Sequence, residues 1–163
     1  MSIAHEVANM SYSQRLKVGA IVVKDNRIIS MGYNGTPEGW DNTCEDRVYM
    51  DPGAGGWLSP DEIALQWPFI ERVGEFDQES RRYKLVTRPE VIHAEMNALM
   101  KLAGSTESGR GASLFTTHSP CLAHGCAIGI YTTGIKEVFY HHEYRDTSGV
   151  DFLRKCNIEV VKL

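Results

Sequence analysis

The sequence lacks any uninterrupted apolar stretch close to the roughly 20 residues that a membrane-spanning helix requires. Its first five residues, Met1 to His5, also lack the basic start and apolar run of a secretory signal. Cysteine is scarce, with four residues in the chain, and in a reducing compartment such residues serve as metal ligands or core residues more often than as disulfides. These features predict a cytoplasmic protein without a membrane partner.

Positive charge is also limited. Lys and Arg total 17 against 21 Asp and Glu, which gives a formal net charge of −4, and the basic residues form no long run. The electrostatic attraction that drives sequence-independent binding to a phosphate backbone is therefore missing, which argues against a long nucleic acid as partner. A small anionic substrate remains compatible, because a few donors inside a pocket can hold one phosphate.

The size and composition indicate one compact domain over residues 1–163. The chain is long enough to bury a full core and too short for two ordinary domains. Its 42% hydrophobic and 23% charged residues are typical of a globular protein rather than of a disordered tail.

The apolar patterns predict alternating strands and helices. Asp25-Asn26 is a polar turn pair, which suggests an antiparallel hairpin between two β-rich runs. The predicted elements are a helix over 3–14, strands over 18–23 and 28–33, a helix over 92–102, a strand over 112–117, a helix from Cys121 or Cys126 to Thr133, and strands over 137–140 and 158–161. This alternation predicts an α/β layer structure.

Glycines and prolines interrupt the pattern after Asn34, which predicts a long loop insertion at about 38–89. Within it, residues 61–67 follow a Ser59-Pro60 start and predict one or two helical turns. A structureless loop of this length is unusual in a small domain, so we expect a substrate cover or an oligomer contact. Its tryptophans, Trp40, Trp57 and Trp67, fit packing better than a pocket cover.

The chemically informative pattern is His93-Ala94-Glu95, followed later by Pro120-Cys121 and then Cys126. Near a helix start, His93 and Glu95 can both reach a substrate bound above the helix end. Cysteines near the start of the next helix meet backbone N–H groups, which favour the thiolate that binds zinc. One histidine and two cysteines would leave the fourth position of a tetrahedral zinc open, as in catalytic zinc sites.

Such a zinc ion lowers the pKa of a water in the open position, so that hydroxide becomes available at neutral pH. Glu95, which is not needed as a ligand, could accept the proton of that water and pass it on to a substrate. The pattern therefore predicts His93, Cys121 and Cys126 as metal ligands and Glu95 as the catalytic acid and base.

These spacings match the signature of zinc nucleobase deaminases. Beyond it, the chain resembles the deoxycytidylate (dCMP) deaminases, including phage forms, over most of its length. The resemblance is carried by Lys17-Val18-Gly19-Ala20-Ile21-Val22, Gly32-Tyr33-Asn34-Gly35-Thr36-Pro37, Val91-Ile92-His93-Ala94-Glu95-Met96-Asn97-Ala98 and Gly134-Ile135-Lys136.

The resemblance implies hydrolysis of dCMP to dUMP and ammonia, which supplies thymidylate synthesis. It further implies a cytidine-deaminase-like three-layer α/β/α fold with a mixed five-stranded sheet, a homo-hexamer and, for a phage-encoded chain, action in the host cytoplasm. The family's Gly-Tyr-Asn-Gly segment is associated with activation by dCTP and inhibition by dTTP, each with Mg²⁺. Residues matching this segment, or placed to meet a phosphate, are Gly32, Tyr33, Asn34, Gly35, Thr36, Arg15 and Lys17. Arg15 and Lys17 are equally compatible with plain surface positions at a helix end.

The chain departs from the family in the zinc region. The family usually has two residues between its zinc cysteines, whereas four separate Cys121 from Cys126, and His124 falls at the usual ligand position. Cys126 is preferred because its distance to Gly134 matches the family's helix and a second thiolate suits zinc, with His124 as the alternative ligand. Of the extra structural zinc ligands in some phage relatives, only Cys44 is present, so one zinc per chain is predicted.

The sequence is also compatible with other functions. The chain could be a different zinc deaminase, acting on free cytidine, tRNA adenosine or a riboflavin precursor, or an inactive zinc module that senses nucleotides. His141-His142-Glu143 fits a solvated loop or interface better than a second metal site, because no further ligand is spaced for it. Cys156 lacks a partner motif and fits a bystander role.

Overall fold

The computed structural model describes residues 1–51, 53, 56–74 and 79–163. They form two compact units, one made of Met1–Thr43 with Glu90–Leu163 and the other of Cys44–Pro89. Residues 52, 54–55 and 75–78, which belong to the predicted loop, lie outside the described residues. Within the described part of the chain, no helix has the length and apolar character to cross a membrane.

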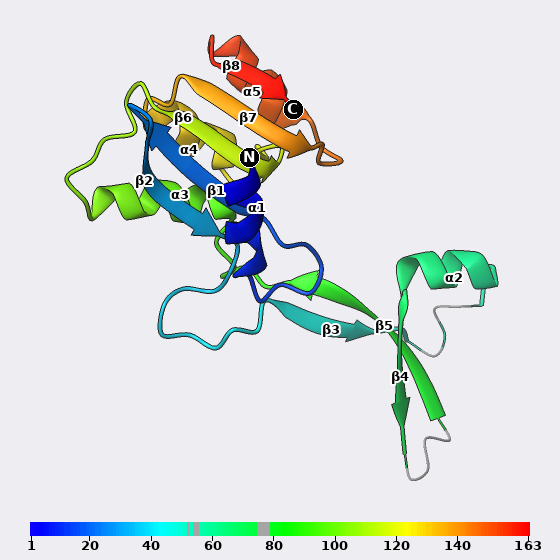
Figure 1. The fold of residues 1–163 in the computed structure, drawn as a ribbon. Coiled ribbons are helices and arrows are strands. Elements are labelled where there is room, and N and C mark those ends of the chain that lie inside the picture. The colour runs from blue at the N-terminus through cyan, green and yellow to red at the C-terminus, as the bar shows by residue number, and fades with distance from the viewer. Residues whose placement is uncertain (52, 54–55, 75–78) are drawn as a thin grey trace. The chain divides into compact units, whose positions relative to one another are not determined.

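The first unit is built on a mixed five-stranded sheet in the order β2-β1-β6-β7-β8 (Figure 1). The strands are β1 (Gly19–Lys24), β2 (Arg27–Tyr33), β6 (Ser113–His118), β7 (Glu137–His142) and β8 (Glu159–Lys162). β1 pairs antiparallel with β2 and β6, whereas β6–β7 and β7–β8 are parallel. Asp25 and Asn26 both have positive φ, which is the backbone of the tight hairpin turn predicted there. The predicted mixed sheet is confirmed.

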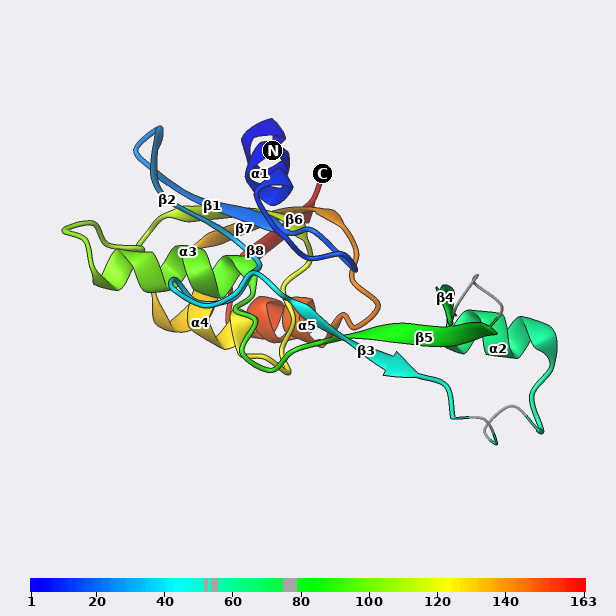
Figure 2. The same ribbon diagram turned by 90° about the horizontal axis from the view of Figure 1, so that it is seen from below.

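Helices cover both faces of this sheet. Figure 2 shows α1 on one face and α3, α4 and α5 on the other, which confirms the predicted three-layer arrangement. The helices are α1 (Ser2–Asn9), α3 (Ala94–Ala103), α4 (Cys126–Thr132) and α5 (Ser148–Lys155). The alternation of side chains along β1 explains the two layers, because Ala20 and Val22 pack in the larger core while Ile21 packs with α1.

The first helix is shorter than predicted, because it ends at Asn9 rather than at residue 14. The hydroxyl of Ser11 accepts a hydrogen bond from the N–H of Ser13, and the hydroxyl of Ser13 accepts one from the N–H of Leu16. Serine side chains that bond nearby backbone groups offer the chain an alternative to the helix. Residues 11–18 therefore form a connection that leads into β1.

Gly32 is required by close packing between β2 and α3. A Cβ atom at this position would lie 2.4 Å from the backbone nitrogen of Ala98 and 2.5 Å from the carbonyl oxygen of Ala94. We predict that Gly32→Ala lowers the free energy of unfolding by about 3 kcal/mol, because backbone atoms cannot move aside cheaply. Urea denaturation of the purified variant measures the loss.

Gly35→Ala is the matched control, since the nearest neighbours of a Cβ atom at Gly35 are ring atoms of Tyr33 at 3.7 Å or more. An equal loss in both variants would contradict the packing argument.

The second unit corrects the prediction of a loop at about 38–89. It contains β3 (Glu45–Tyr49), α2 (Pro60–Gln66), β4 (Phe69–Val73) and β5 (Glu79–Thr87), with an antiparallel sheet in the order β3-β5-β4. The helical turns expected after Ser59 are confirmed as α2, where Ser59 and Glu62 form a reciprocal capping box.

The strands of this unit were missed because they bury little. Leu85 is the only hydrophobic residue within the described parts of these three strands that is buried. The sheet is held by backbone pairing and by surface contacts, including the ion pair of Arg47 with Glu71 and the stacked rings of Phe69 and Tyr83. A sheet of this kind lacks the alternating apolar pattern by which strands are predicted from sequence.

Candidate metal centre and active site

His93 is held between a strand-like bridge and a helix. The preceding residue, Ile92, pairs with Gly35 through two backbone hydrogen bonds of 2.9 and 3.1 Å. His93 itself is the extended N-cap residue of α3, and its carbonyl oxygen accepts a hydrogen bond from the N–H of Asn97. The backbone of His93 is therefore held by hydrogen bonds on both sides, and this fixes the position of the imidazole at the start of α3.

Cys121 follows β6, and Cys126 is the first residue of α4. The four intervening residues form a tight turn, in which the N–H of Gly125 bonds to the carbonyl of Leu122 and the N–H of Ala127 bonds to the carbonyl of Cys121. Gly125 has a φ of 77°, a conformation that glycine adopts without steric cost. The turn returns the chain to Cys121, so the two residues beyond the family spacing do not separate the thiols.

The three predicted ligands meet at one point. The Nδ1 atom of His93 lies 3.4 Å from the Sγ atoms of both Cys121 and Cys126, and the three donor atoms lie within 4.8 Å of one another. His124 is solvent-exposed, with its Nδ1 atom 3.9 Å from the Cys121 sulfur and its ring 4.6 Å from the His93 ring. It stands at the rim of the group of three donors and is not part of it.

The hydrogen bond between the two thiols shifts their pKa values in opposite directions. The hydrogen bond from Cys126, assisted by one from His93, lowers the pKa of Cys121 to about 3 in spite of its burial. The same hydrogen bond and burial raise the pKa of Cys126, and the contact with Cys121 raises the pKa of His93. The site thus carries thiolate character beside an imidazole. This nitrogen and sulfur donor set fits a zinc ion.

Glu95 lies next to these donors in the first turn of α3, with 4% of its surface exposed. Burial is the largest cause that raises the pKa of its carboxyl to about 7, while the positive charge of His93 acts in the opposite direction. A carboxyl group with this pKa changes protonation readily near neutral pH, as general acid and base catalysis requires.

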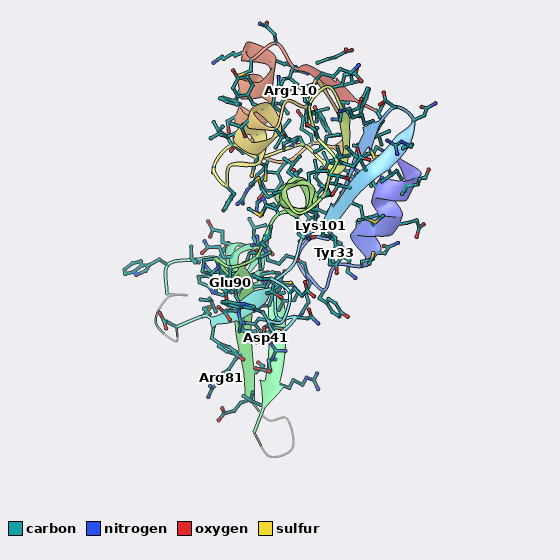
Figure 3. The ribbon with its side chains drawn as sticks, turned by 90° about the vertical axis from the view of Figure 1, so that its left-hand side faces the viewer. Tyr33, Asp41, Arg81, Glu90, Lys101 and Arg110 are labelled. Atoms are coloured by element: carbon teal, nitrogen blue, oxygen red, sulfur yellow. The ribbon has the colours of Figure 1, made fainter. Side chains whose placement is uncertain are left out.

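The segment predicted to meet nucleotides runs beside the metal centre. Asn34 uses its side chain on the backbone, accepting from the N–H of Val18 and donating to the carbonyl of Leu16, both at 2.8 Å. The ring of Tyr33 on β2 lies near Lys101 on α3, whose Nζ atom is 5.8 Å from the ring centre (Figure 3).

The remaining residues of that prediction are spread over the same region. Thr36 donates to the carbonyl of Asp41, and Gly35 is the bridge partner of the residue before His93. Arg15 and Lys17 are exposed, and both lie in the connection after α1 rather than at a helix end. Asn97 had no assigned role from sequence, yet its amide donates to the carbonyl of Tyr33 and links α3 to this segment.

A histidine at the start of α3 and two cysteines between the end of β6 and the start of α4, beside a buried carboxyl group of raised pKa, are typical of zinc-dependent hydrolases that activate water. The model of the cytidine and deoxycytidylate deaminase zinc-binding region matches residues 1–142. The chain belongs to this deaminase family.

Two phage deaminases are similar to the chain over nearly its whole length. The chain is 35% identical over 173 residues to the deoxycytidylate deaminase of Enterobacteria phage T4, covering 98% of this chain and 86% of the relative. Its structure is similar to that of the dCMP deaminase from cyanophage S-TIM5 in complex with dCMP and dUMP, with a TM-score of 0.72, 37% identity and coverage of 99% and 92%.

A more distant structural relative combines a deaminase with a reductase. The diaminohydroxyphosphoribosylaminopyrimidine deaminase and reductase from Thermotoga maritima gives a TM-score of 0.60 at 26% identity, and the match covers 99% of this chain and 34% of that one.

Proposed function

We propose that this chain hydrolyses dCMP to dUMP and ammonia and thereby supplies the precursor of thymidylate. The main observation in support of this proposal is that His93, Cys121 and Cys126 converge beside the buried carboxyl of Glu95. The similarity to phage dCMP deaminases over nearly the full chain supports the choice of substrate. The lower identity to the deaminase and reductase from Thermotoga maritima makes that deaminase activity the weaker candidate.

In this proposal His93, Cys121 and Cys126 hold one zinc ion, with His124 as the alternative third ligand. A zinc ion held by these residues would lower the pKa of a water next to the base of the substrate. Glu95 accepts a proton from that water, transfers it to N3 of the cytosine ring, and then moves the second proton to the exocyclic amine at C4. Water oxygen replaces the amine on C4, and ammonia leaves.

Substrate choice is tested by following the loss of cytosine absorbance with dCMP, deoxycytidine and CMP at equal concentrations. We expect dCMP to give at least a hundredfold higher kcat/KM than deoxycytidine, because loss of the phosphate leaves charged donors without a partner, at a cost of about 3 kcal/mol. Equal rates for dCMP and deoxycytidine would contradict a nucleotide substrate. Complete inactivity toward all three compounds, with zinc bound, would favour the inactive sensing module.

The regulation proposed for this chain is activation by dCTP and inhibition by dTTP, each with Mg²⁺. Gly32, Tyr33, Asn34, Gly35, Thr36, Arg15 and Lys17 are the residues proposed to contact nucleotide. The support is their position, since the bridge between Gly35 and Ile92 joins this segment to the residue before His93.

We predict that Arg15→Ala requires about tenfold more dTTP for half-maximal inhibition, because one charged hydrogen bond to a phosphate contributes about 1.5 kcal/mol. Initial rates of dCMP loss over a dTTP series in Mg²⁺ buffer provide the measurement. Arg27→Ala is the control, since Arg27 is engaged with Glu107 at the hairpin. A wild-type enzyme that shows no response to dTTP would remove the regulatory proposal and leave the catalytic one intact.

In this proposal residues 1–163 form one deaminase domain, the Cys44–Pro89 unit is an insertion within it, and the chain assembles as a homo-hexamer. The insertion carries large hydrophobic side chains on its surface, which support contact with further copies of the chain: Val48, Tyr49, Trp57, Leu65, Phe69, Ile70 and Val86. Native mass spectrometry of the purified protein gives the number of copies.

A further inference from the structure

Three histidines meet outside the catalytic centre. His5 lies on α1, and His141 and His142 are the last two residues of β7. The Nε2 atom of His5 lies 3.0 Å from the Nδ1 atom of His141, and one nitrogen from each of the three rings lies within 4.8 Å of the others. We refer to these residues as the histidine cluster.

We propose that the histidine cluster is a second metal site, which binds a divalent transition-metal ion such as Zn²⁺ through three imidazole nitrogens. Imidazole is a preferred ligand of zinc, copper and nickel, and three such ligands leave room for water in a tetrahedral site. Donor atoms this close need little side-chain rotation to reach a common ion. With this site the chain would bind more than the one zinc ion predicted from sequence. The sequence offered no third ligand to complete a metal site with His141 and His142.

The surroundings of the histidine cluster disfavour the protonated form of His5. Burial lowers the pKa of His5, and His141 and His142 lower it further. The neutral imidazole is the form that coordinates metal. Two neighbouring carboxylates make hydrogen bonds elsewhere, since Glu143 accepts from Lys162 and Glu6 accepts from Asn9.

The cluster shares no residue with the catalytic centre, and it joins two different elements of the first unit. His5 comes from the helix on one face of the sheet, and the two other histidines come from the carboxyl end of a central strand. An ion bound here would fasten α1 to β7. Because a ligand that binds the folded state stabilises it, zinc at this site should raise the melting temperature of protein already loaded with catalytic zinc.

The test uses the purified full chain dialysed against a buffer with fixed free Zn²⁺, followed by metal counting with mass spectrometry. We expect two zinc ions per wild-type chain and one per chain in His5→Ala and in His141→Ala. The melting temperature of the wild type should increase with the second equivalent, and that of the two variants should not.

Glu143→Gln is the matched control, because it alters the residue next to the cluster without removing a nitrogen donor, and it should retain two zinc ions. A wild-type count of one would overturn the proposal. A count of two that persists in both histidine variants would also overturn it, because the additional zinc would then lie elsewhere. Neither result bears on the deaminase activity, which depends on other residues.

Discussion

Glu95→Gln is expected to lower the turnover of dCMP by about 10²- to 10⁴-fold, the usual contribution of a positioned general acid and base. Glutamine has nearly the shape of glutamic acid, but it cannot accept and release a proton. The substitution replaces a carboxyl group that is 4% exposed and whose pKa is raised to about 7, so a neutral amide should be accommodated. Loss of cytosine absorbance under saturating dCMP measures the effect.

Zinc content should remain at the wild-type value in Glu95→Gln, because this residue is not part of the three-donor group. Glu107→Gln serves as the control, since Glu107 pairs with Arg27 at the far end of the hairpin, and its turnover should not change. Unchanged turnover in Glu95→Gln would exclude the proposed proton transfer, even if the metal were bound as described.

The second prediction with a large expected effect concerns which residue is the third zinc ligand. Cys126→Ser should lose catalytic zinc and with it the deaminase activity, whereas His124→Ala should retain both. Cys126 is fully buried, with its sulfur 3.4 Å from the Nδ1 atom of His93, and a hydroxyl group is a poor substitute for a thiolate. The exposed His124 approaches the Cys121 sulfur no closer than 3.9 Å.

Metal analysis of the two purified variants, with a zinc-edge anomalous difference map of the wild type, distinguishes the two ligand sets. Zinc loss in His124→Ala with retention in Cys126→Ser would reverse the assignment. Circular dichroism establishes that the serine variant remains folded, so that metal loss is not a consequence of unfolding.

Much of the first unit could be predicted from sequence because its elements carry strong local signals. The β1–β2 hairpin follows from two apolar runs around Asp25-Asn26, and α3 follows from the spacing of Ala94, Ala98 and Leu102. The apolar runs also predicted the five strands, but their arrangement in one mixed sheet was implied by the family resemblance and not by periodicity. α5 was missed, because its apolar residues fall in a short stretch between polar segments.

The residues of the candidate site could be identified from sequence, but their geometry could not be predicted. The spacing of Cys121 and Cys126 left His124 open as a ligand, since no sequence rule shows that Gly125 would turn the chain back. The histidine cluster was missed for a different reason. His5 is 136 residues from His141, and only the packing of α1 against the sheet brings the two rings together.

The pairing of Gly35 with Ile92 has a mechanical consequence. Two hydrogen bonds connect the Gly-Tyr-Asn-Gly segment to the peptide that immediately precedes His93. A molecule bound to this segment would therefore act on backbone that is hydrogen-bonded to the residue next to His93.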